Sequence, residues 1–275
     1  MQNAEAFEQF LVLSGLQSIT VQGYLGSAKR FTRVVGENPS EADVNKFVYN
    51  LYTSTYSYSH KTNTVLAIEK YMAFLGRPMQ LGRQKKPKRI VKDTLTEAEV
   101  TKLIFNCKNV REKAIVALLA YSGIRNSELC NLKVKDVDLG KNQLTINQGK
   151  GLKDGKCEIS PECTKILLEY LNTYEYGPRL PDDYLFTTLR KNNQYHTGDL
   201  RKLIHVLGKR AKIERRIWPH LIRHSLSVNL LMRGANIFLI QKQMRHTLIE
   251  TTFTYLNSIV IGLRNDYEKY APSYL

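Results

Sequence analysis

The sequence is poor in cysteine and contains no long apolar run. Its 275 residues include only four cysteines, Cys107, Cys130, Cys157 and Cys163, and none of them forms a CxxC pair. So few cysteines exclude a disulfide framework of the secreted type, and we expect a protein of the reducing cytoplasm without a zinc site. The longest apolar stretch, 114–121, is much shorter than the roughly 20 residues that a membrane-spanning helix needs. We therefore expect no transmembrane segment.

Proline is also scarce, with 8 residues, and the sequence shows no internal repeat or low-complexity tract. Hydrophobic residues make up 43% and charged residues 24% of the chain. These values are typical of an ordinary globular protein and exclude the disordered and collagenous classes. The first ten residues, MQNAEAFEQF, carry two acids and no basic cluster before an apolar run, so we expect no signal or transit peptide.

Acidic residues are outnumbered: 41 lysines and arginines stand against 25 acids, which gives a formal net charge of +16. A polyanion such as DNA is the first partner that this excess predicts. The charge is concentrated in the segment 80–92, which has six basic residues, no acid and an internal proline. We interpret 80–93 as an extended linker whose basic residues either contact a DNA backbone or are simply solvated; the candidates for DNA contact are Arg83, Lys85, Lys86, Lys88 and Arg89.

Apolar periodicity and helix-end signals predict a mainly α-helical protein with one small sheet. Before the linker, four helices are predicted at about 5–13, 20–35, 40–52 and 60–75. After it, helices are predicted at about 97–106 and 111–121, then short antiparallel strands within 137–160, then helices again from residue 161 to the end. The pairs Ser40 with Asp43 and Thr96 with Glu99 have the spacing of N-terminal capping boxes. The prediction is therefore an α+β fold with two parts, 1–79 and 94–275.

The first group of candidate site residues lies in the segment SGIRNSEL, at 122–129. Arg125 follows the helix-ending Gly123 and begins a new helix, where unpaired backbone N–H groups favour a phosphate. The alternative is a surface arginine that pairs with Glu128 three residues later.

The second candidate is Lys150, which lies between two glycines on a predicted hairpin. Its ammonium group is suited to donate a proton to a leaving oxygen if its pKa is lowered. The surrounding residues do not match a phosphate-binding P-loop. Lys153 and Lys156 lie on the same hairpin and are rivals for this role.

The third group lies towards the C-terminus: His220 and Arg223 share one helix face, and His246 and Tyr255 follow. His220 and His224 have a spacing that zinc ligands use, but the glutamate of HExxH and a third ligand are missing. Two arginines, a lysine, two histidines and a tyrosine suit metal-free phosphoryl transfer. In such a site arginines bind phosphate oxygens, histidines move protons and a tyrosine attacks the phosphorus.

These motifs, read in order as SGIRNSEL, QGKGLKDGK, HLIRHS, LLMRGANIFLIQKQMRH and TTFTY, resemble those of the tyrosine recombinases, and the layout is most similar to that of the Xer group. The resemblance covers most of residues 94–260. It implies that Arg125, Lys150, His220, Arg223 and His246 form the active pocket, that Tyr255 is the nucleophile and that Glu128 supports the pocket. It also implies an N-terminal four-helix core-binding domain at 1–79 and a catalytic domain at 94–275.

By the same resemblance, the enzyme cuts and rejoins double-stranded DNA through a 3′-phosphotyrosyl intermediate without ATP, metal or cofactor. Two chains would bind inverted-repeat half-sites and four would assemble, in dimer resolution, chromosome partition or integration of a mobile element. The residues after Tyr255 would form a tail that docks either on a neighbouring subunit or on its own domain. The alternatives are a type IB topoisomerase and a noncatalytic DNA-binding regulator.

One departure from the family pattern precedes His246. Members commonly have Leu-Gly at this point, whereas this chain has Met244 and Arg245. We expect either that Arg245 contacts DNA or that the local turn differs.

Overall fold

The chain divides into two compact units, Met1–Ile90 and Val91–Leu275, and each has its own hydrophobic core. The boundary falls within the segment 80–93, where the sequence predicts a linker. The computed structural model describes residues 3–85, 87, 94–147, 155–173, 180–188 and 193–245.

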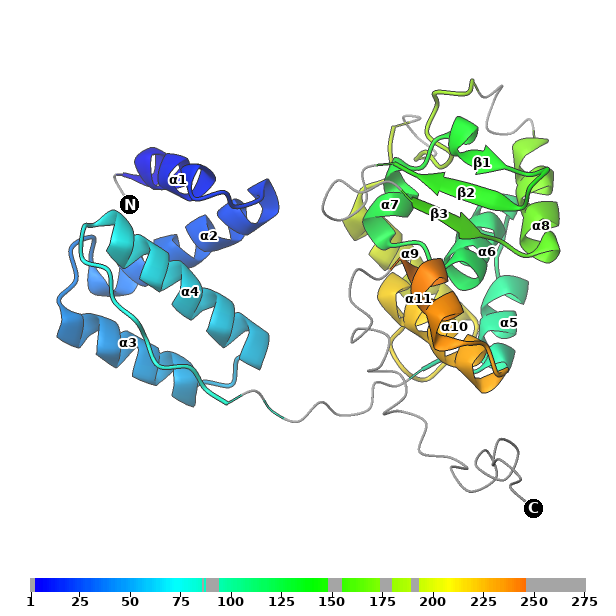
Figure 1. Ribbon diagram of the computed structural model, residues 1–275. Coiled ribbons are helices and arrows are strands. Elements are labelled where there is room, and N and C mark those ends of the chain that lie inside the picture. The colour runs from blue at the N-terminus through cyan, green and yellow to red at the C-terminus, as the bar shows by residue number, and fades with distance from the viewer. Residues whose placement is uncertain are drawn as a thin grey trace, which may run out of the picture. The chain divides into compact units, whose positions relative to one another are not determined.

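The first unit consists of four helices, drawn in blue to cyan in Figure 1: α1 (Ala4–Leu13), α2 (Ser18–Val35), α3 (Glu41–Thr53) and α4 (Tyr58–Phe74). Each begins and ends within two residues of its predicted bounds, so these predictions are confirmed. Helix α4 packs against α1, α2 and α3. Aromatic side chains centre this core: Phe7 lies edge-on to Tyr71, with ring centroids 5.3 Å apart, and Phe31 and Phe74 lie beside them.

The segment after α4 is attached to the first unit. The Arg83 guanidinium forms an ion pair with Glu69 of α4 at 2.5 Å, and the Tyr52 hydroxyl of α3 donates to the carbonyl of Gly82 at 2.5 Å. Arg83 therefore lies against the first unit, with its side chain 41% exposed. Lys85 is exposed, while Lys86, Lys88 and Arg89 lie outside the described residues.

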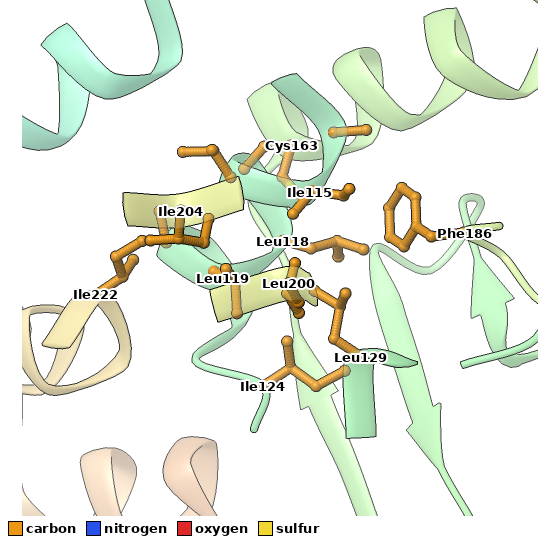
Figure 2. Close-up of a cluster of buried hydrophobic side chains, with 14 of the residues drawn as sticks. Ile115, Leu118, Leu119, Ile124, Leu129, Cys163, Phe186, Leu200, Ile204 and Ile222 are labelled. Atoms are coloured by element: carbon orange, nitrogen blue, oxygen red, sulfur yellow. The ribbon is translucent and has the colours of Figure 1, made fainter. Parts of the chain in front are cut away.

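The second unit surrounds helix α6 (Val110–Ser122), which contains the longest apolar stretch of the sequence. All seven residues from Ala114 to Ala120 are buried, because α5, α8 and α10 pack against different sides of α6. Figure 2 shows Ile115, Leu118 and Leu119 of α6 within the hydrophobic cluster. The other helices of this unit are α5 (Glu97–Phe105), α7 (Asn126–Asn131), the 3₁₀ helix η1 (Val134–Asp136), α8 (Pro161–Leu171), α9 (Thr197–Arg210), α10 (Pro219–Met232) and α11 (Ile237–Met244).

A three-stranded antiparallel sheet accompanies these helices, as predicted, in the order β1 (Val137–Asp138), β2 (Gln143–Ile146) and β3 (Gly155–Glu158). In its register Leu144 pairs with Cys157 and Ile146 pairs with Gly155. The side chains of Leu144, Ile146 and Cys157 are buried in the core of this unit. Because neighbouring side chains on a strand point to opposite faces, Lys156 points away from the face of Cys157 and is exposed.

Both predicted capping boxes are confirmed. The Ser40 hydroxyl accepts the backbone N–H of Asp43 at the start of α3, and the Thr96 hydroxyl accepts that of Glu99 at the start of α5. In each case the carboxylate bonds back to the N–H of the capping residue.

Of the helices that the described residues form, none is both long enough and apolar enough to cross a membrane.

Candidate active site

The site begins where α6 ends, because the chain turns sharply there to start α7. Gly123 adopts φ +64°, a conformation that glycine takes without strain. A Cβ atom on Gly123 would lie 2.8 Å from the Met244 sulfur of α11, so the absence of a side chain also allows α11 to approach. The Ser122 hydroxyl, which donates to the Leu118 carbonyl at 2.6 Å, accepts the Ile124 N–H at 3.1 Å. These contacts fix the position of Arg125, the next residue.

Arg125 occupies the N-cap position of α7 and binds the carboxylate of Glu128 twice. Its backbone N–H donates to Glu128 Oε2 at 2.8 Å, and its Nη1 donates to Oε1 at 2.5 Å. The prediction that the backbone N–H here is unpaired and available for phosphate is therefore wrong for Arg125 itself. The pairing with Glu128 does occur, but Glu128 is buried rather than a surface partner. The Arg125 side chain is 20% exposed, so the guanidinium reaches solvent.

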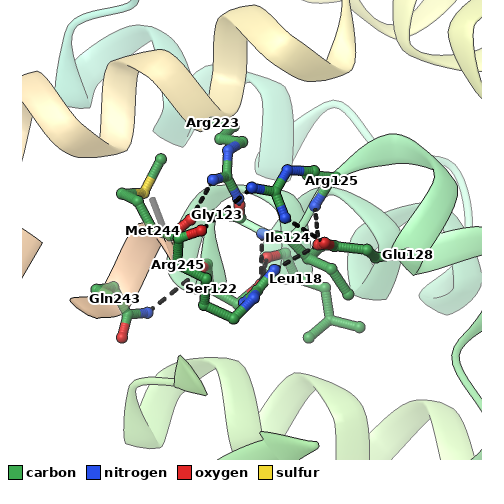
Figure 3. Close-up of polar contacts among 10 residues, drawn as sticks. All are labelled: Leu118, Ser122, Gly123, Ile124, Arg125, Glu128, Arg223, Gln243, Met244 and Arg245. Carbon is green, nitrogen blue, oxygen red and sulfur yellow. Dashed lines mark hydrogen bonds and ion pairs between the residues drawn. The ribbon is translucent and has the colours of Figure 1, made fainter. Parts of the chain in front are cut away.

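Arg223 reaches the same turn from α10, which Pro219 begins at its first position. Its guanidinium is buried; Nη1 donates to the carbonyl of Gly123 and Nη2 to the carbonyl of Met244. Figure 3 shows the guanidinium groups of Arg223 and Arg125 on the same side of this turn. The fold therefore brings together two arginines that the sequence separates widely.

His220 lies one helical turn before Arg223 on α10 and is exposed. His224, one residue after Arg223, is buried. Among the residues that the structure describes, no group of three or more His, Cys, Asp or Glu side chains is arranged to hold a metal ion.

Arg245 joins these residues, although the sequence analysis did not place it in the site. It caps the C-terminus of α11 with φ +49° and ψ +47°. Its backbone carbonyl accepts from Arg125 Nη2 at 3.2 Å, and its own Nη2 donates to Glu128 Oε2. The side chain is only 12% exposed. Its guanidinium is thus held inside the protein by Glu128, and the backbone keeps a left-handed turn of the kind glycine favours. The sequence signal for the special position of Arg245 was the presence of Met-Arg where family members commonly have Leu-Gly.

The described part of the site is positively charged, since the guanidinium groups of Arg125 and Arg245 bind the carboxylate of Glu128 and that of Arg223 binds the backbone of the same turn. Burial works to raise the pKa of Glu128, but the charge of Arg245, the backbone N–H of Arg125 and the charge of Arg125 together hold it below its ordinary value. Glu128 is therefore ionised at neutral pH and neutralises only part of the positive charge. Such a set of guanidinium groups attracts a phosphate and can bind its oxygens at two points.

Lys150, His246 and Tyr255 lie outside the described residues, as does Lys153. His246 follows Arg245 directly in the chain, and Lys150 belongs to the connection between β2 and β3. Of the rival lysines, Lys156 lies within the described residues and points away from the face of β3 that Arg245 contacts.

The comparisons with known proteins agree with this geometry. The sequence pattern of the phage integrase family matches residues 93–260, more than half of the chain. The chain is 33% identical over 269 residues to tyrosine recombinase XerA of Pyrococcus horikoshii, which covers 96% of this chain and 92% of that protein.

Solved structures also resemble the chain, two recombinases among them. The crystal structure of XerA recombinase has a TM-score of 0.60 and 27% identity, with all of both chains covered. The structure of the site-specific recombinase XerH bound to difH substrate shares the fold with a TM-score of 0.69 and 19% identity, covering 92% of this chain and 81% of that one. The chain therefore belongs to the phage integrase family and is a Xer-like tyrosine recombinase, an enzyme that breaks and rejoins DNA.

Proposed function

We propose that the protein exchanges DNA strands through a covalent link between Tyr255 and the DNA. The observation that carries this proposal is the arrangement of Arg125 and Arg223, whose guanidinium groups bind consecutive carbonyls, those of Arg245 and Met244, in the turn before His246. A phosphate at these guanidinium groups would lie beside the chain segment that leads to the nucleophile. The order of the motifs along the sequence supports the same assignment.

In the proposed reaction, the Tyr255 oxygen forms a bond to the scissile phosphorus and the bond to the 5′ oxygen breaks. The phenol proton leaves to a nearby base, and Lys150 donates a proton to the leaving 5′ oxygen. Arg125, Arg223 and His246 stabilise the charge that grows on the phosphate oxygens, and His220 relays protons. The released 5′-hydroxyl then attacks the phosphotyrosyl link of the partner strand, so bond energy is conserved and neither ATP nor a metal ion takes part.

The substrate we propose is double-stranded DNA with inverted-repeat half-sites, each bound by one chain, with four chains assembled for exchange. In this scheme 1–79 is the core-binding domain, 80–93 the linker with Arg83, Lys85, Lys86, Lys88 and Arg89 along the DNA backbone, and 94–275 the catalytic domain. The biological role is resolution of DNA dimers or movement of a mobile element, in the cytoplasm. The four cysteines are free thiols, which suits a reducing compartment.

The Tyr255→Phe variant tests the covalent step. Wild-type protein is incubated with sheared host DNA in EDTA, denatured, and any DNA still attached to protein is recovered and sequenced. We expect attachment that maps to one recurring site, and we expect Tyr255→Phe to abolish it while DNA binding by gel shift is unchanged, because only the phenol oxygen is lost.

Attachment that persists in Tyr255→Phe would show that another residue is the nucleophile. Binding to the recurring site without any attachment by the wild type would favour a noncatalytic DNA-binding regulator. Continuous relaxation of a supercoiled plasmid by single chains would favour the topoisomerase alternative.

A further inference from the structure

Arg245 stands where the backbone favours glycine. Its φ of +49° and ψ of +47° lie in the left-handed region, which residues with a side chain rarely adopt and glycine adopts freely. Helix α11 ends at Met244, and Arg245 is its C-terminal cap, so this conformation belongs to the turn that ends the helix. An arginine at this position is not required by the backbone, so its side-chain contacts are of interest.

The side chain of Arg245 crosses from the end of α11 over β3 towards α7. Its Cδ lies so close to Gly155 of β3 that a Cβ atom there would be only 2.7 Å away. The guanidinium then passes the buried thiol of Cys157, whose pKa burial raises and the Arg245 charge lowers, and bonds to Glu128. The missing side chain at Gly155 creates the space for this path.

The contacts of Arg245 form a closed ring with Arg125 and Glu128. Glu128 Oε1 accepts from the Arg125 guanidinium, and Oε2 accepts from the Arg125 backbone N–H and from Arg245 Nη2. The Arg125 guanidinium in turn donates to the Arg245 carbonyl. Oε2 is thus shared between the two arginines while Oε1 binds Arg125 alone, and the turn before His246 is bonded to α7 through backbone and side chain together.

This ring decides how much positive charge Arg125 can offer a phosphate. With Arg125 alone, the buried carboxylate of Glu128 would cancel the charge of its partner, leaving a neutral pair. With Arg245 present, the group of three carries a net charge of one positive unit next to Arg223. Because negative charge grows on the phosphate oxygens as the nucleophile attacks, the additional charge favours the transition state over the bound substrate.

We propose that Arg245 is a positioning residue of the recombination site, which neutralises Glu128 so that Arg125 remains available to the scissile phosphate and which fixes the turn that carries His246. The inference rests on the proposed function, because the phosphate is the group that Arg125 would bind. It adds to that proposal a residue at which this chain departs from the family pattern.

The test is Arg245→Gly in single-turnover cleavage of a suicide DNA substrate, in which the nicked product cannot religate. Glycine accepts the left-handed turn, so we expect the variant to fold, which a thermal unfolding curve checks. At saturating protein, we expect cleavage roughly 10- to 100-fold slower than in the wild type, the size of effect that a small misplacement of catalytic groups produces. The dissociation constant for the uncleaved DNA should change little, because most contacts with the duplex lie elsewhere.

Three further variants separate this role from a general loss of charge or fold. Arg233→Gln removes one positive charge from a side chain that is 71% exposed and paired with Glu97, and should cleave at the wild-type rate. Arg245→Lys, which can still pair with Glu128, should recover part of the lost rate. Gly155→Ala should slow cleavage in the same direction, because its Cβ displaces the Arg245 side chain without removing a charge.

A double-mutant cycle with Glu128→Gln completes the experiment. Since both residues act through one contact, the effect of Arg245→Gly should be much smaller in the Glu128→Gln background. A wild type that cleaves through Tyr255 and an Arg245→Gly variant that cleaves equally fast would overturn the inference and leave the proposed function standing. A wild type that binds the site but forms no link through Tyr255 would overturn both.

Discussion

At the scale of single residues, the charge of the site depends on the carboxylate of Glu128. It is buried and yet ionised, because Arg245 and Arg125 offset the unfavourable effect of burial on the charged form, and its pKa lies below the ordinary 4.5. A carboxylate with a lowered pKa in the folded state stabilises that state at pH values above its pKa in the unfolded chain. This stabilisation is lost as the pH falls through the pKa of the folded state.

The pH dependence of stability should therefore reveal Glu128. We expect the difference in unfolding free energy between the wild type and Glu128→Gln to be constant between about pH 6 and about pH 7 and to shrink as the pH falls below about 4.5, where the wild-type carboxylate becomes protonated. Urea denaturation at a series of pH values measures this difference in unfolding free energy. Exposed carboxylates such as Asp43 and Asp182 titrate in the same way in the wild type and in Glu128→Gln, so they do not contribute to the difference in unfolding free energy. A difference that stays constant down to the acid transition would contradict the ionised, buried state.

At the scale of elements, the second unit depends on α6. Most residues of this helix are buried, and its last residue, Ser122, leads directly into the turn that holds Gly123 and Arg125. Disturbing the packing of α6 is therefore expected to affect both the stability of the second unit and the position of the site.

Leu118→Ala in α6 tests this dependence. Leu118 has no exposed surface, and a buried leucine-to-alanine change costs about 2–5 kcal/mol of unfolding free energy. Leu168→Ala in α8 is the matched control, since Leu168 is 48% exposed and a surface change of this kind stays within about 0.5 kcal/mol. Equilibrium urea unfolding of the full chain gives both values. Equal effects of the two variants would show that α6 is not the centre of this core.

The sequence predicts individual helices and strands well, but it does not predict which of them contact one another. The capping boxes at Ser40 and Thr96, and the four helices of the first unit, follow from patterns within a few residues, so local chemistry is enough to find them. The position of Arg125 after a helix-ending glycine was found in the same way. What could not be found was that Glu128 and Arg245 share a contact, because this depends on the packing of α7, β3 and α11, which no local period encodes.

At the scale of the whole molecule, the excess of sixteen positive charges favours binding to DNA. Each lysine or arginine that neutralises a DNA phosphate releases a condensed counterion, so affinity for DNA depends on salt in proportion to the number of such contacts. The contacts proposed for the segment 80–93 contribute to this number.

Lys85→Gln tests that contribution. If the Lys85 ammonium contacts a phosphate, the slope of the logarithm of DNA affinity against the logarithm of salt concentration should become shallower by about one unit. Lys113→Gln is the control, because Lys113 interacts with Glu169 at 3.5 Å and should leave the slope unchanged. Fluorescence anisotropy with one labelled duplex at several salt concentrations gives both slopes. An unchanged slope in Lys85→Gln would remove Lys85 from the DNA contacts.

The ring of Arg125, Glu128 and Arg245 also has a consequence for the order in which the protein is made. Arg125 and the carbonyl that it binds are 120 residues apart, and Glu128 and Arg245 are 117 residues apart. A ribosome that has already released α6 and α7 must therefore translate the chain as far as Arg245 before the ring can close. Under the proposed function Tyr255 emerges later still, so a nascent or prematurely terminated chain would lack the assembled centre with which to cut DNA.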